Sequence, residues 1–117
     1  MKAKAFAKMR DVIESDWKKY SARLPMWRER YLAKQNARIA RVLADPKKNH
    51  TERFWDALEE MEKEAKTLRA CLDRHSRSNM MLSLLRMRAV GMINAEDLAD
   101  FSEELQKSIF QDIFKQG

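Results

Sequence analysis

Two residue types that can bind metals or act as nucleophiles lie close together in the chain, at Cys71 and His75. Four residues apart on a helix, their side chains could reach one metal ion. Zinc needs three or four protein ligands, and the chain offers no second cysteine and only one other histidine, His50. A buried thiol beside a histidine at the end of a packing stripe is the simpler interpretation, so we predict no metal and no cofactor.

Other arrangements that support catalysis are also missing from the sequence. Cys71 lies inside an expected helix, where the helix dipole gives a thiol little activation. The acidic run between Glu59 and Glu64 is typical of a solvated helix face, since general acid–base catalysis needs a carboxylate pair in a shaped pocket. Both glycines are isolated, so there is no phosphate-binding loop. We predict that the protein is not an enzyme.

The segment 91–98 has some features of a calcium-binding loop. Gly91 would take the turn position and Asp97 the last ligand position of an EF-hand. Arg86 and Arg88 then fall where carboxylates are required, and they would repel the ion. We expect a simple corner between two helices.

Cationic and aromatic residues are interleaved between positions 17 and 41. Cations neutralise phosphates and aromatic rings stack on exposed bases, so this pattern could bind nucleic acid. The aromatic residues, however, share one packing stripe and are more typical of a core. Nucleic-acid binding is therefore the alternative function, and its candidate residues are Lys18, Lys19, Arg23, Arg28, Arg30, Arg38 and Arg41.

Methionines are frequent, with eight in the chain and four of them between Met80 and Met92. Flexible thioethers could line an adaptable groove for a partner helix, or they could fill the core. The candidate partner-binding residues are Met80, Met81, Leu84 and Met87.

The composition indicates one all-α domain covering residues 1–117. The chain is 44% hydrophobic and 36% charged, with two glycines and two prolines, which is too apolar for disorder and too poor in turn residues for a β fold. Strong helix formers dominate. We predict a bundle of about five helices with coiled-coil-like packing.

The clearest pattern is an apolar stripe in residues 51–76. Spacings of three and four residues put its side chains on one helical face. The stripe comprises Phe54, Leu58, Met61, Ala65, Leu68 and Leu72. We expect this long helix to be the central helix of the bundle, with the stripe buried against the helix before it.

The remaining helices are expected around this one. Residues 3–23 and 25–44 should form two nearly collinear helices joined at a kink, because Pro25 lacks an amide donor and clashes with the preceding turn. A loop at 45–50 follows. Asn49 or Thr51 could cap the central helix, and Asn49 with Glu52 matches a capping box. Further helices are expected at 80–90, ended by Gly91, and from Asn94 to about residue 115.

Charge is unevenly distributed along the chain. The net charge is +6, with 14 basic and 5 acidic residues in positions 1–50 and 10 basic and 13 acidic residues in positions 51–117. The basic half could meet nucleic acid, an anionic membrane surface or an acidic protein. It could equally pair with the acids of residues 52–64 in its own chain, and the sequence does not decide between these.

The predicted function is that of a non-catalytic helical interaction protein, a small adaptor or regulator. We expect it to form a homodimer, another homo-oligomer or a complex with a helical protein, because its seams and methionines offer more apolar surface than a small monomer covers. One cysteine, no apolar signal-peptide core and no apolar run of membrane-spanning length predict a cytoplasmic protein without membrane contact.

Overall fold

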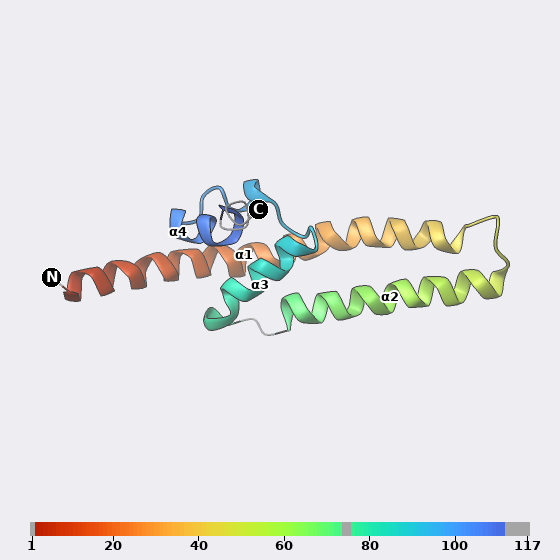
Figure 1. Ribbon diagram of the computed structural model, residues 1–117, viewed down its shortest axis with the longest axis horizontal. Coiled ribbons are helices and arrows are strands. Elements are labelled where there is room, and N and C mark those ends of the chain that lie inside the picture. Colours follow the sequence, from red (N-terminus) through yellow and green to blue (C-terminus); the bar gives the residue numbers. More distant parts are fainter. Residues whose placement is uncertain (1, 74–75, 112–117) are drawn as a thin grey trace.

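The computed structural model describes residues 2–73 and 76–111, with side chains from Ile13 to Phe110. These residues form four α-helices and three short helical turns, and no strand (Figure 1). The all-α prediction is confirmed, whereas the predicted bundle of five helices is not. The elements are α1 (Lys2–Leu43), α2 (His50–Leu72), η1 (Arg77–Asn79), α3 (Met80–Ala89), η2 (Ala95–Leu98), α4 (Glu103–Gln106) and the π-helical η3 (Lys107–Gln111).

Helix α1 runs without interruption through Pro25, so the prediction of two separate helices is wrong and the sharp kink is not confirmed. Proline inside a helix costs about 3 kcal/mol. Four large side chains on one face of α1 are buried, two before Pro25 and two after it. The burial of each contributes about 1.5–3 kcal/mol of stability. They are Tyr20, Leu24, Trp27 and Tyr31. Because a break in the helix would move two of them out of register, packing outweighs the local preference of proline.

Helix α2 begins where the sequence predicts. The Asn49 side chain accepts a hydrogen bond from the Glu52 amide at 2.8 Å, and the Glu52 carboxylate accepts one from the Asn49 amide at 3.2 Å. The helix ends at Leu72 rather than at Ser76, which instead caps η1. With 23 residues against 42, α2 is shorter than α1, and its predicted role as the long central helix is not confirmed.

Gly91 ends α3 in the predicted way. It adopts a left-handed backbone with φ of +78°, which favours glycine. The Gly91 amide donates to Arg88 and the Met92 amide to Met87 at 2.8 Å, which is the Schellman pattern of helix termination. The chain thus reverses after Ala89 and brings the C-terminal segment back across α1.

The C-terminal segment is not the single helix predicted from Asn94 to about residue 115, and its end lies outside the described residues. Asn94 forms a capping box with Asp97, but the helical element that starts there is only the short η2. A second start follows at Ser102, whose hydroxyl caps α4 while its amide and hydroxyl both donate to the buried Asp16 carboxylate, at 2.9 and 2.6 Å. Asp16 therefore interrupts the expected helix and anchors α4 to α1.

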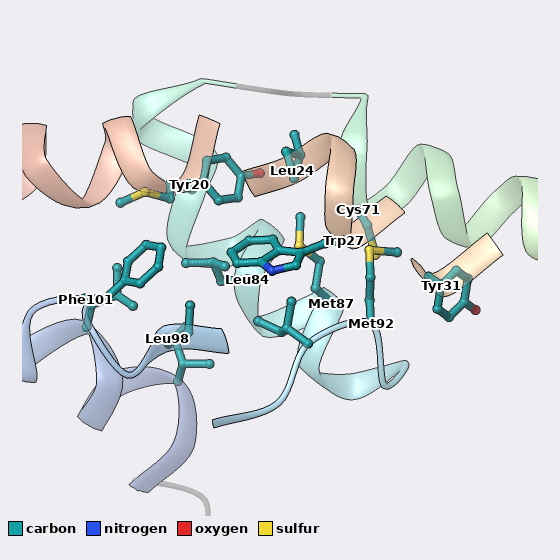
Figure 2. Packing of buried hydrophobic residues seen from close by; sticks show 14 residues of the cluster. Tyr20, Leu24, Trp27, Tyr31, Cys71, Leu84, Met87, Met92, Leu98 and Phe101 are labelled. Atoms are coloured by element: carbon teal, nitrogen blue, oxygen red, sulfur yellow. The ribbon is translucent and has the colours of Figure 1, made fainter. Parts of the chain in front are cut away.

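One hydrophobic core joins α1, α3, the end of α2 and the C-terminal segment. Trp27 is fully buried at its centre, among Tyr20, Leu84, Met87 and Leu98 (Figure 2). The Trp27 ring lies 6.3 Å from the rings of both Tyr20 and Phe101. The core thus depends on one large indole from the middle of α1. We call the part of the molecule around this core the body.

The molecule is elongated. Its extents are 69 × 30 × 19 Å and its radius of gyration is 18.4 Å, against roughly 13 Å for a compact domain of this length. The molecule extends beyond α3 and α4 at both ends: the first turns of α1 extend at one end, and at the other end lies an antiparallel hairpin of residues 32–65, which we call the arm (Figure 1). The arm is therefore a two-helix layer without a third layer to cover it.

We predict that the two tryptophans at positions 27 and 55 contribute unequally to stability. Trp27→Ala should lower the free energy of unfolding by about 3–5 kcal/mol, because it leaves a large cavity in the core. Trp55 is 60% exposed, so Trp55→Ala should cost less than about 1 kcal/mol. Urea unfolding followed by circular dichroism measures both, and equal losses would contradict this description of the core.

Candidate functional site

Of the possible metal-binding or nucleophilic pair, the structure describes only Cys71. Cys71 is 1% exposed within the core, and burial raises the pKa of its thiol. His75 lies outside the described residues. Within the described part of the chain, no three histidine, cysteine or acidic residues come close enough to hold a metal ion. Cys71 is thus a core side chain.

The segment that partly matches a calcium-binding loop is a structural corner. Asp97 accepts two hydrogen bonds from Arg30, at 2.7 and 2.9 Å, and one from the Asn94 amide. The Arg30 hydrogen bond contributes to lowering the pKa of Asp97, against the effect of its burial. The carboxylate that would have bound calcium therefore holds the corner against α1.

A shallow hollow lies where the loop 44–49 meets α2. It is lined by Val42, Asp45, Lys48, Asp56, Glu59 and Glu60. Lys48 already pairs with Asp56, and the Asp45 carboxylate accepts a hydrogen bond from the Lys47 amide. These carboxylates are therefore engaged in holding the loop.

Three of the predicted nucleic-acid-binding cations bind the C-terminal segment instead. Arg23 makes a two-pronged contact with the Asp100 carboxylate at 2.5 and 2.6 Å, and Lys19 donates to the Asp100 carbonyl. Arg30 contacts Asp97 in the same two-pronged way and also donates to the Met92 carbonyl at 3.0 Å. These contacts hold η2 and the following turn on α1.

A fourth predicted cation, Arg38, pairs with the acids of α2. It donates to Glu60 at 2.8 Å and to Glu64 at 3.4 Å, and this contact lowers the pKa of Glu60. Tyr31 donates a hydrogen bond to the other Glu64 oxygen at 2.5 Å. Burial raises the pKa of Tyr31, and the Glu64 carboxylate raises it further. The predicted pairing with the acids of residues 52–64 thus occurs, and Arg38 is the one of the seven candidates that takes part in it.

The remaining three candidates, Lys18, Arg28 and Arg41, are exposed and separated along α1. The aromatic residues that were to stack on bases are buried or half-buried in the core, as at Tyr20 and Trp27. The predicted basic and aromatic residues consequently do not form one continuous binding face.

The predicted partner-binding residues divide between core and surface. Met80, Leu84 and Met87 are each at most 5% exposed and belong to the core of the body. In the single chain they fill the interior, contrary to the prediction that they face a partner. Met81 is 37% exposed, next to the exposed Leu82. The methionine-rich segment thus mainly fills the interior, because α3 packs against both α1 and the C-terminal segment.

The strongest apolar exposure is on the arm. Leu43 is 49% exposed, Phe54 57%, Trp55 60% and Met61 50%. Phe54 and Met61 belong to the stripe that the sequence predicts to be buried against the preceding helix. That prediction is wrong at these two positions, since only Ala57 and Cys71 of α2 are fully buried.

Helical geometry explains why the stripe is exposed. Successive residues of a helix are rotated by about 100°, and α2 meets α1 through Ala57, Glu60 and Glu64. The stripe lies about a quarter turn further round α2. Its members in the arm are Phe54, Leu58, Met61 and Ala65.

Helix α1 carries a matching stripe. It meets α2 through Tyr31 and Arg38, and Leu32, Ile39 and Leu43 lie about a quarter turn further round in the same sense. Because the two helices are antiparallel, both displacements lead to the same side of the hairpin. We call the resulting surface the apolar face. Its exposed members are Leu43, Phe54 and Met61, with the half-buried Leu32, Leu58 and Ala65 beside them, whereas Ile39 is buried within the chain.

The opposite side of the arm is charged. It carries the pair of Lys48 with Asp56, and Lys63 between Glu59 and Glu60 at 3.7 Å. The arm is therefore amphipathic as a two-helix unit. Sequence reasoning identified the apolar stripe of α2 but missed that it shares a side with the stripe of α1.

Comparison of the chain with protein-family models, with curated proteins and with solved structures found no match. Among the described residues, no helix combines the length and the apolar character that spanning a bilayer requires. The function is therefore argued from the surfaces themselves.

We predict an acid-sensitive contact at Asp100. The Arg23 guanidinium lowers the pKa of Asp100 to about 2, from 3.8 in the absence of partners. Because the folded pKa lies below the unfolded one, this contact stabilises fully above about pH 4 and is lost as the pH falls through about 2. Asp100→Asn should therefore lower the urea midpoint at neutral pH and flatten its decline in acid.

The matched control is Glu103→Gln, which changes an exposed carboxylate that forms no ion pair in the described structure. Urea midpoints measured at steps between neutral pH and the acid limit compare the three proteins. If Asp100→Asn and Glu103→Gln both follow the wild-type acid dependence, Asp100 is not a stabilising partner of Arg23.

Proposed function

We propose that this protein is a non-catalytic helical interaction protein, a small adaptor or regulator that associates with itself and has the cytoplasm as its compartment. The observation that carries the proposal is the arm, which presents large apolar side chains to solvent beyond the reach of the body. Exposed apolar surface of this kind is typical of interaction sites.

The charge arrangement supports contacts between proteins. Three of the cations that could attract polyanions are paired with carboxylates of the same chain, namely Arg23, Arg30 and Arg38. Nucleic-acid binding stays a prediction, and its remaining support is the exposed trio of Lys18, Arg28 and Arg41. The buried thiol of Cys71 is consistent with a reducing compartment.

We predict reversible self-association. The mass measured by light scattering on a sizing column should rise from the monomer value of 13.9 kDa toward twice that value as the loaded concentration increases. An interface limited to one hairpin is small, which predicts modest affinity and hence concentration dependence. A mass that stays at the monomer value at every concentration would contradict the proposal.

A further inference from the structure

The arm lacks a core of its own. Of its large apolar side chains only Ile39 is fully buried, with the small Ala57 opposite. The core cluster of the body includes no residue of α1 beyond Tyr31. Two helices side by side bury only their shared seam, whereas four can enclose a core. The apolar face is therefore one half of a bundle whose other half is missing from the single chain.

The charge of the arm permits a second copy of this chain to supply that other half. Residues 32–65 hold seven basic and seven acidic residues, so the arm is neutral and the whole net charge of +6 lies elsewhere. On α1 within the arm, Lys34 and Arg41 lie on the side opposite the apolar face, and Arg38 lies in the seam with α2. Two identical arms can thus meet face to face without repulsion, despite the positive charge of the molecule.

The size of the face also fits a second copy of itself. At about 1.5 Å per residue the arm helices are roughly 20 Å long, and two adjacent helices are roughly 20 Å wide. Two such faces would bury roughly 800 Å² in total, which is in the size range of weak, transient interfaces. Self-pairing around a two-fold axis would use the same face on both chains.

We propose that two copies of this chain pack the apolar faces of their arms together and form a four-helix bundle. This inference rests on the proposed self-association and specifies its surface. In the bundle, Phe54 and Met61 from one helix and Leu43 from the other enter a shared core. The ion pairs of Lys48 and Lys63 remain on the outer side of the bundle.

Sedimentation equilibrium on three variants tests this interface. Met61→Glu and Leu43→Glu place a carboxylate on the apolar face from α2 and from α1, and each should weaken dimerisation at least about tenfold, because a buried charge without a partner is costly. Met26→Glu is the matched control, since Met26 is 55% exposed, close to the 50% of Met61, but lies on α1 outside the arm. Its dissociation constant should change less than about twofold.

The outcomes separate this inference from the proposed function. If wild type dimerises and both arm variants dimerise equally well, the apolar face is not the interface, although self-association stands. If Met26→Glu disrupts the dimer as strongly as Met61→Glu, the arm is likewise not the specific interface. A wild type that stays monomeric overturns the proposed self-association itself.

Circular dichroism melts accompany each variant. Because Met61 and Leu43 are half exposed in the monomer, both variants should remain helical when dilute. Loss of the fold in either variant would mean that the monomer itself buries that side chain, which would also overturn the proposal.

Discussion

The length of α1 is the constraint on which the rest of the structure depends. Its 42 residues span about 63 Å, far more than one small core can cover. The middle of α1 packs its aromatic stripe into the body around Trp27. The last third has only α2 beside it, so the molecule consists of a compact body and an arm with one uncovered side (Figure 1).

Ion pairs determine which elements lie on which side of this helix. Arg23 and Arg30 hold the C-terminal segment through Asp100 and Asp97, while Arg38 holds α2 through Glu60. A guanidinium can bind both oxygens of one carboxylate, so such contacts fix orientation as well as proximity. Several cations of the basic N-terminal half are therefore used within the chain, where they align acids that are distant in sequence.

Local structure could be predicted from the sequence, because it depends on neighbouring residues. The Asn49 cap, the Gly91 stop and the buried aromatic stripe of α1 are confirmed. The continuous helix through Pro25 could not be predicted, since tertiary packing outweighs the local cost. The new helix start at Ser102 could not be predicted either, because it depends on a hydrogen bond to Asp16, 86 residues earlier in the chain.

The direction that the apolar face points was equally beyond sequence reasoning. Heptad-like spacing shows that Phe54, Leu58 and Met61 share a side of α2, but not that α1 contacts α2 a quarter turn away. That angle is set by Ala57, Glu60 and Glu64, which meet Tyr31 and Arg38 across the seam. Polar contacts thus occupy part of the seam, and Phe54 and Met61 of the apolar stripe stay exposed.

The central claim is that the arm is uncovered in one chain and covered when two chains meet. Amide hydrogen exchange, measured by mass spectrometry over a range of protein concentrations, tests this directly. Peptides from residues 32–65 should exchange more slowly as the concentration rises, while those from α3 should not change. Exchange in the arm that is the same at every concentration would contradict the account.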